Sequence, residues 1–254
     1  MTDLFDIVHE IRLLVDHLLV INKQSDLVCH PTKHGPLSSL ISRVRLYLGE
    51  AVRPHLINRL DRETSGLVVV AKTPEAALEL RRKWEANEVE KRYLAIVHGR
   101  LGEAATMVDA PLGKDERSPV AIKDCVRMDG AQARTELQRL HVFSRDWCDY
   151  SLLEVRPMSG RKHQIRIHLA FLGHPIVGDK LYGSDERFYL DFVEGKLAES
   201  ARKVLIFPSH ALHAHRISLV WRSFAVEFAS SPEPWFCSFV PDWEWGRETT
   251  DGHG

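Results

Sequence analysis

The chain has 254 residues, of which 44% are hydrophobic and 27% are charged. This ordinary globular composition excludes a disordered or collagen-like chain, and the length fits one large domain or two small ones. The formal net charge is −1, from 34 basic and 35 acidic residues, which by itself argues against a nucleic-acid-binding protein.

The sequence carries no feature of a membrane or exported protein. It holds no run of 18 apolar residues, so it predicts no transmembrane helix. The first ten residues include three acids and lack the basic region of a signal or transit peptide. The cysteines are scattered, which favours free thiols in a cytoplasmic protein over a zinc or redox motif. These cysteines are Cys29, Cys125, Cys148 and Cys237.

Hydrophobic patterning predicts both strands and a helix in the first part of the chain. A short apolar run at 17–22 predicts a strand, and prolines at both ends of 31–36 predict a loop. Apolar residues at helical spacing predict a helix over 37–48. Residues 54–60 are expected to be extended, and the unbroken apolar run at 66–72 predicts a buried strand.

The middle of the chain adds a helix and three strands. Residues 74–87 predict a helix with proline at its first position. Apolar or alternating segments predict strands at 92–98, 134–143 and 150–155. Residues 102–130 are rich in glycine, proline and charge, and they predict a long loop or a hairpin insertion.

The last third is predicted to contain one helix and two strands. Apolar residues at i, i+4 and i+7 predict a helix over 163–172, which Gly173 ends. Strands are predicted at 211–221 and 224–228, and from residue 230 the chain is rich in proline, tryptophan and acids. These elements favour an α+β fold with one mixed sheet and a few helices.

A polar cluster at 58–66 directly precedes the predicted buried strand. In one interpretation it is a turn, which Asp61 and Thr64 cap and in which Gly66 takes an unusual backbone angle. In the other, Asp61 is a nucleophile or base, because a carboxylate can attack an electron-poor carbon and form a covalent intermediate. Desolvation raises the pKa of such a carboxylate, so this site would need a guanidinium placed against it.

A basic cluster at 159–168 holds three cations and two histidines. It is either the solvated start of the predicted helix, with His168 buried, or part of a functional site. A metal site is disfavoured, because His163, His168 and His174 are five and six residues apart and do not share one helical face. A metal is also disfavoured at the second histidine group, which comprises His210, His213 and His215.

A third candidate is Tyr93, which lies within the predicted strand at 92–98. A tyrosine in an apolar strand is usually part of the core, with its hydroxyl hydrogen-bonded at one end. As a functional residue it could stack on a planar ring or take a proton. The pattern alone leaves both interpretations open.

In combination, these clusters resemble the RluA-like family of RNA pseudouridine synthases, and the similarity covers most of the chain. The matching blocks follow one another in the order found in the family, which is far more specific than any single motif. The blocks are LLVINK at 18–23, NRLDRETSGLVVVAK at 58–72, KRYLAIVHG at 91–99, SGRKHQIRIH at 159–168, GHPIVGDKLYG at 173–183 and LHAHRISL at 212–219.

The resemblance implies an enzyme that isomerises uridines in ribosomal or transfer RNA to pseudouridine, without a cofactor or a metal. It also implies the pseudouridine synthase fold, a mixed and mostly antiparallel sheet flanked by helices and loops. The family's catalytic aspartate corresponds to Asp61, its active-site tyrosine to Tyr93, and the arginine that pairs with the aspartate to Arg166. The arginine that replaces the flipped base in the stack corresponds to Arg59. The expected RNA contacts are Arg59, Arg62, Arg161, Lys162 and His163.

Two positions depart from the common pattern of the family. Asn58 stands where many members have histidine, and Gln24 follows Lys23 where proline is frequent. Asparagine is also familiar at the first position, so activity is still expected. The second departure is expected to alter the loop that follows.

The resemblance covers a stand-alone catalytic architecture. About 16 residues precede the first predicted strand, too few for a separate RNA-binding domain. We expect one catalytic domain over 1–254, with an extension at about 1–16 and an acidic tail at about 230–254. We expect it to act as a monomer, without a membrane or an obligate protein partner.

Three other functions are compatible with parts of the sequence. A catalytically inactive RNA-binding relative is disfavoured, because Asp61, Tyr93 and Arg166 are all present. A metal-dependent hydrolase that uses the histidines would lose its activity in a chelator. A small-molecule enzyme with an aspartate nucleophile would not bind RNA in a salt-dependent way.

The charge of the chain is unevenly distributed. Residues 1–26 carry a net charge of −3 and residues 225–254 a net charge of −5, which leaves +7 for residues 27–224. The blocks with the candidate catalytic residues all lie in this basic middle. The near-neutral total therefore conceals a basic domain with acidic ends, a distribution that fits contact with RNA phosphates.

Overall fold

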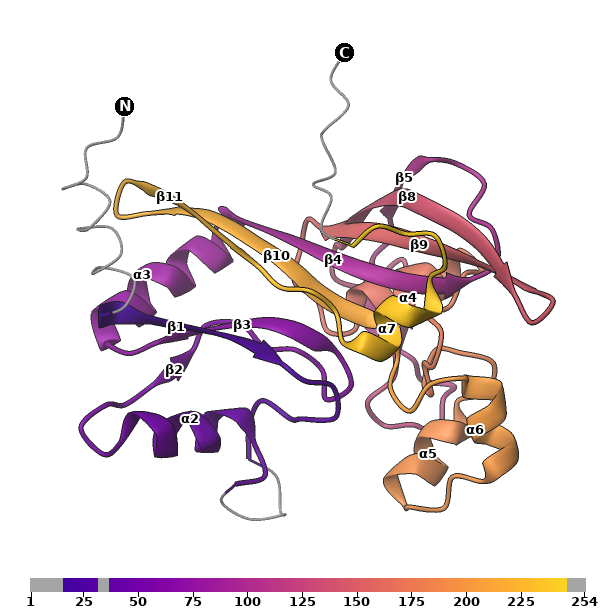
Figure 1. Cartoon of the computed structure of the whole chain (residues 1–254), viewed down its shortest axis with the longest axis horizontal. Coiled ribbons are helices and arrows are strands. Elements are labelled where there is room, and N and C mark those ends of the chain that lie inside the picture. Colours follow the sequence, from indigo (N-terminus) through magenta and orange to yellow (C-terminus); the bar gives the residue numbers. More distant parts are fainter. Residues whose placement is uncertain (1–15, 32–36, 246–254) are drawn as a thin grey trace.

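A computed structural model describes residues 16–31 and 37–245 of the protein (Figure 1). A sheet of nine strands runs through the molecule, with helices packed against it. In spatial order its main strands are β1 (Leu18–Lys23), β3 (Ser65–Ala71), β10 (Leu212–Trp221), β4 (Val89–His98), β9 (Cys148–Pro157), β8 (Arg134–Arg145) and β5 (Ala105–Asp109). Two further strands pair at the side, β11 (Phe224–Ala229) with β10 and β2 (His55–Leu56) with β3.

The sheet is mixed but mostly antiparallel, which confirms the predicted α+β class. Among the described residues, β3 and β10 pair in parallel and the other neighbours pair antiparallel. The segment at 102–130, predicted as a long loop or hairpin insertion, supplies β5 to this sheet. It also forms a separate hairpin of β6 (Leu112–Lys114) and β7 (Asp124–Val126).

Six helices lie in the described ranges. They are α2 (Leu40–Leu48), α3 (Pro74–Glu85), α4 (Gln164–Phe171), α5 (Arg187–Val193), α6 (Glu199–Leu205) and α7 (Pro234–Phe239). The first three agree with the predicted helices to within three residues at each end, whereas the sequence patterns do not predict the last three. No helix in these ranges is both long enough and apolar enough to cross a membrane.

β3 is buried on both faces, and all seven of its side chains are buried. Leu67 and Val69 pack in one apolar cluster with residues of α3, while Val68 and Val70 pack in another with residues of α2. Successive side chains of a strand point to opposite faces. A strand packed between two helices needs apolar side chains on both faces, which explains the unbroken apolar run. Because β3 is held in the core, the polar turn directly before it is held at the end of this strand.

Backbone hydrogen bonds place two distant segments beside β4. The amide of Val177 donates to the carbonyl of Ile96 at 2.9 Å, and the amide of Ala211 donates to the carbonyl of Val177 at 2.8 Å. Residues 176–177 and 211 thereby lie beside β4. Their neighbours in the chain reach the turn before β3, where Lys180 bonds Glu63 and His210 bonds Thr64. The fold thus gathers polar segments from three separate parts of the chain.

The division of the chain into extension, domain and tail stays a prediction. The predicted extension at 1–16 and the loop at 31–36 fall almost wholly outside the described residues, as does the end of the tail at 246–254. The described part of the tail contains α7, whose Phe236 and Phe239 are buried in the main apolar cluster.

Gly66 allows β3 and β10 to approach closely. Its φ is +111°, and a Cβ atom at this position would collide with the backbone of Ala214. We expect Gly66→Ala to lower the free energy of unfolding by about 1–3 kcal/mol. Alanine is strained at this positive φ, and the backbones of β3 and β10 must also move apart to make room for its Cβ atom. Urea unfolding measures this, with Gly102→Ala as the control, since the added Cβ there meets nothing within 4 Å. Equal loss of stability in both variants would contradict this packing.

Candidate active site

The polar turn before β3 is pinned in place and carries Asp61. The amide of Thr64 donates to the Asp61 carbonyl at 3.2 Å. The side chain of Asn58 donates to the Leu67 carbonyl at 3.0 Å and accepts from the Val69 amide at 2.8 Å. The turn expected from the sequence is therefore present, but the side chains of Asp61 and Thr64, expected to cap it, bond Arg166 and His210 instead. It leaves the Asp61 side chain 32% exposed, so this turn is also compatible with a reactive carboxylate.

Arg166 reaches this carboxylate from α4. Its Nη1 donates to Asp61 Oδ2 at 2.9 Å, while its Nε and Nη2 donate to the two oxygens of Asp179 at 2.7 and 2.9 Å. The side chains of Arg166 and Asp179 are buried. The expected pair of Asp61 and Arg166 is thus present in the structure. The sequence patterns did not indicate Asp179 as a second partner, although it lies within the matching block at 173–183.

Burial and pairing act in opposite directions on the two carboxyl groups. Burial raises the pKa of Asp61 and of Asp179, because it removes water from the charged form. The Arg166 guanidinium outweighs burial at both positions and holds each pKa below its ordinary value. Since a guanidinium does not deprotonate in proteins, Asp61 is an ionised carboxylate at neutral pH, as a nucleophile must be.

Tyr93 lies in β4, where it pairs with Val155 of β9 and with Ala214 of β10. Burial, together with the negative charge of Asp61, raises its pKa to about 12. The hydroxyl therefore keeps its proton at neutral pH. It has no hydrogen-bond partner among the described residues, so it is available to a ligand bound near Asp61.

His163, an expected RNA contact, lies inside the site. Its side chain is only 8% exposed, and its Nε2 is 3.7 Å from Asp61 Oδ2. Its Nδ1 is hydrogen-bonded to the Tyr182 hydroxyl at 2.9 Å. Burial, assisted by the positive charge of Arg166, lowers its pKa to about 4. His163 is therefore neutral and packed beside the carboxylate, and it does not supply a cation for a phosphate.

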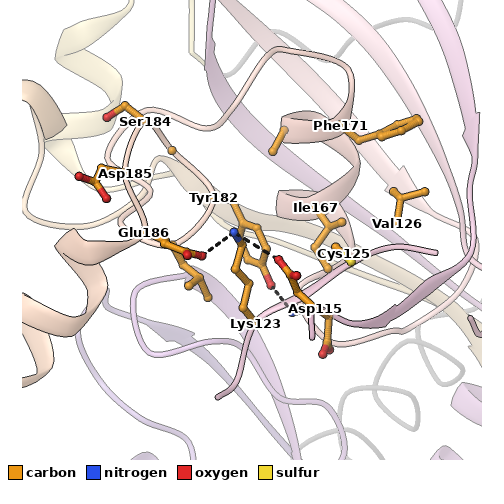
Figure 2. Close-up of a pocket in the computed structure, with 14 residues that line it drawn as sticks. Asp115, Lys123, Cys125, Val126, Ile167, Phe171, Tyr182, Ser184, Asp185 and Glu186 are labelled. Atoms are coloured by element: carbon orange, nitrogen blue, oxygen red, sulfur yellow. Dashed lines mark hydrogen bonds and ion pairs between the residues drawn. The ribbon is translucent and has the colours of Figure 1, made fainter. Parts of the chain in front are cut away.

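Tyr182 packs on Arg166 and also lines a separate hollow, which Figure 2 shows. Its ring centroid lies 4.9 Å from the Arg166 guanidinium carbon. The hollow measures about 560 Å³ and is lined by the β6–β7 hairpin, α4 and residues 181–186. Acids outnumber cations on its walls, and its Lys123 is already paired with Glu186 at 2.7 Å. It is distinct from the Asp61 site and is unsuited to RNA phosphates.

Two of the expected RNA contacts are ion-paired within the protein. Arg62 Nε lies 2.6 Å from an Asp26 carboxylate oxygen, and Lys162 Nζ lies 2.8 Å from Asp124. All four side chains keep some exposure, so these pairs are weak and exchangeable. A phosphate that binds there must compete with a carboxylate.

The other two expected contacts have no carboxylate partner in the described part of the chain. Arg161 donates from Nε to the carbonyl of Gln132 at 3.2 Å. Arg59 is exposed and forms no hydrogen bond or ion pair with any described residue. Arg59 precedes Asp61 by two positions, so the segment that carries Asp61 also carries an exposed arginine without a carboxylate partner among the described residues. Their roles in RNA binding stay a prediction.

The histidines considered as metal ligands have other partners. His168 Nε2 donates to the Ala110 carbonyl at 2.9 Å, and its Nδ1 bonds the Thr135 hydroxyl at 2.8 Å. His213 Nδ1 is bonded to the Ser65 hydroxyl at 2.9 Å. Within residues 16–31 and 37–245, no group of three or more His, Cys, Asp and Glu side chains could hold a metal ion.

We expect the His163 imidazole to stay neutral under mildly acidic conditions. With a pKa of about 4, only about 3% of it is protonated at pH 5.5, against about 90% for an unperturbed histidine. Nitrogen-15 chemical shifts of the imidazole ring measure this, and His163→Gln assigns the signal. An imidazolium at pH 5.5 would contradict the buried placement of this residue.

Comparison with known proteins is in keeping with this geometry. A profile of the RNA pseudouridylate synthase family matches residues 17–171. Ribosomal large subunit pseudouridine synthase D of Nitrosomonas europaea is 38% identical over 208 residues, which cover 80% of this chain and 56% of that protein. The mitochondrial tRNA pseudouridine(32) synthase of Saccharomyces cerevisiae is 38% identical over 174 residues, which cover 67% of this chain and 36% of that protein.

The fold has a similar counterpart among solved structures. Human RNA pseudouridylate synthase domain containing 1 has a TM-score of 0.68 at 26% identity, over 88% of this chain and 83% of that one. The chain spans about half to three fifths of the length of its bacterial relatives. The matched family range contains Asp61, Tyr93 and Arg166, which the fold brings to one site. The chain therefore belongs to the RNA pseudouridylate synthase family, and to the RluA-like type that its sequence resembles.

Proposed function

We propose that the protein is an RNA pseudouridine synthase that isomerises uridines in ribosomal or transfer RNA. The observation that carries this proposal is an ionised Asp61 held by Arg166, with the protonated Tyr93 hydroxyl nearby, in a chain of this family. Ribosomal RNA and transfer RNA are proposed as substrates because the two relatives described above are named for these RNA classes. Pseudouridine mapping of total RNA with and without the gene separates the two classes.

The reaction begins with extrusion of the target uridine, because its glycosidic bond is inaccessible within a stack. Extrusion costs a few kcal/mol, and least in a loop or bulge. Arg59 is exposed and unpaired among the described residues, two positions before Asp61. Its planar guanidinium can stack between bases and fill the gap that the uridine leaves.

Asp61 then attacks the extruded nucleotide, either at the ribose carbon or at the base. The attack forms a transient covalent bond to Asp61, and the bond between N1 and C1′ breaks. The base rotates, a bond forms between C5 and C1′, and the bond to Asp61 breaks, which restores the carboxylate. C5 loses its proton and N1 gains one, so the product is an isomer of the substrate. This balance calls for no redox or group-transfer cofactor.

Tyr93 and Arg166 act on the base and on the nucleophile respectively. With its pKa near 12, Tyr93 is a neutral hydroxyl, and its ring can stack on the uracil. The hydroxyl can serve the proton transfer at C5 only as a relay, in which the oxygen accepts the C5 proton as it releases its own to solvent. Arg166 keeps Asp61 ionised and oriented through a charge-assisted hydrogen bond.

Cations on and after α2 are suited to contact RNA beyond the target base. Arg43, Arg45 and Arg53 are exposed and have no carboxylate partner among the described residues. The start of α2 is linked to the Asp61 turn, because Ile41 N donates to the Cys29 carbonyl and the Cys29 thiol contacts the backbone of Leu60. Phosphates on either side of the extruded nucleotide can therefore reach these arginines.

The protein is proposed to act as a single catalytic domain and a monomer in the cytoplasm. All four cysteines are free thiols, which suits a reducing compartment. Light scattering coupled to size-exclusion chromatography tests the oligomeric state.

Asp61→Asn tests the proposed function. The amide keeps the shape of the carboxylate but is no nucleophile, so product formation is expected to fall to background, while the RNA dissociation constant changes less than about threefold. Tritium release from RNA labelled at uridine C5 measures turnover, and filter binding measures affinity. Asp185→Asn is the control, because Asp185 pairs with the exposed Arg187. Robust turnover by Asp61→Asn would refute the assignment.

A further inference from the structure

A second buried ion pair lies two residues after Asp61. Lys180 Nζ donates to Glu63 Oε1 and to the carbonyl of Pro208, the latter at 2.6 Å. The side chains of Lys180 and Glu63 are 1% and 10% exposed. Lys180 also directly follows Asp179, the carboxylate that holds Arg166. Two consecutive residues therefore contact two parts of the site. Asp179 binds the Arg166 guanidinium, and Lys180 binds Glu63 in the turn that carries Asp61.

We propose that Lys180 is a positioning residue for the reaction proposed above. By holding Glu63, it fixes the turn that carries Asp61 and leaves Arg166 free to serve Asp61. Its side chain is buried, so it acts through Glu63 and does not touch the RNA. This role rests on the proposed function.

The charge balance of the cluster explains why an ammonium group is needed there. Asp61, Glu63 and Asp179 are three carboxyl groups that all interact with one guanidinium, that of Arg166. A buried carboxylate without a cation is strongly disfavoured. Without Lys180, Glu63 would therefore compete with Asp61 for Arg166 or take up a proton. Burial already raises the pKa of Glu63, although Lys180 opposes it.

His210 does not replace this cation. Its Nε2 is hydrogen-bonded to the Thr64 hydroxyl at 2.7 Å, and its Nδ1 lies 3.7 Å from Glu63 Oε2. Burial, with Arg166 nearby, lowers its pKa to about 3, so it is neutral at physiological pH. The titratable and charged groups around Asp61 and Glu63, besides Lys180, are Lys23, Tyr93, His163, Arg166, Asp179, Tyr189 and His210. Among the described residues, Lys180 alone hydrogen-bonds the Glu63 carboxylate.

Lys180→Met tests the proposal, because it keeps the length of the side chain and removes its charge. We expect kcat to fall by about tenfold or more while KM changes less than about threefold, since the residue cannot reach the RNA. We also expect the acid limb of the kcat pH profile to move to higher pH, because Asp61 must then share Arg166 with Glu63. A purely structural role would not move this limb. Lys83→Met, which breaks an exposed pair with Glu88, is the matched control.

The double variant Glu63→Gln/Lys180→Met removes both charges of the pair, so that no unpaired carboxylate remains at position 63 to compete with Asp61 for Arg166. We expect its kcat to return to within about threefold of the wild-type value and its acid limb to return to the wild-type pH. This result supports the proposal even if Lys180→Met alone does not fold.

Three results would overturn the positioning role while wild-type turnover stands. They are a folded Lys180→Met with wild-type kcat and acid limb, a folded double variant as impaired as the single one, and a double variant that fails to fold. The last result would make the pair a folding device. Absence of turnover in the wild-type protein, in contrast, would refute the proposed function itself.

Discussion

The site depends on one guanidinium that two carboxylates share. Arg166 has five donors in a fixed plane, so it can bind Asp179 through two of them and still direct a third at Asp61. Asp179 is itself anchored, because its Oδ1 accepts from the amides of Leu181 and Tyr182, each at 2.9 Å. The arginine is therefore aligned by a carboxylate tied to the backbone, and it can stabilise Asp61 without giving up a proton. The surrounding fold keeps these three residues, far apart in the chain, within contact.

Sequence patterns predicted the elements that carry a strong local signal and missed those that arise from tertiary contacts. β3 and α3 were predicted because their apolar patterns are long and proline or polar residues mark their ends. α4 has only eight residues, and it was predicted from apolar residues at i, i+4 and i+7 followed by Gly173. α5 and α6 have seven residues each and no capping side chain, so no periodic signal distinguishes them. Likewise, the resemblance identified Asp61 and Arg166, but only the folded chain shows Asp179 and Lys180 beside them. His163 was expected as an RNA contact, and its burial beside Asp61 is visible only in the folded chain.

The ion pairs in the structure change how the net charge of the chain is interpreted. The middle of the chain carries a net charge of +7, yet many of its cations are paired within the domain, including Arg62 and Lys162. Fewer cations are thus free for phosphates than the sequence suggests, and the unpaired ones include Arg59 beside the Asp61 turn. For the proposed reaction, a modest unpaired charge near the site would favour recognition through the shape of the RNA and through the extruded base.

The pKa of the Asp61 carboxyl tests the central claim most directly. Carbon-13 NMR titration of the wild-type protein and of Arg166→Gln measures it. Arg166 outweighs burial in the wild-type protein, so its pKa should lie below the ordinary value of 3.8. In the variant, burial is no longer opposed by the guanidinium, so the pKa should rise above 3.8. The same pKa in both proteins would show that Arg166 does not control the charge of Asp61, and it would contradict this account of the site.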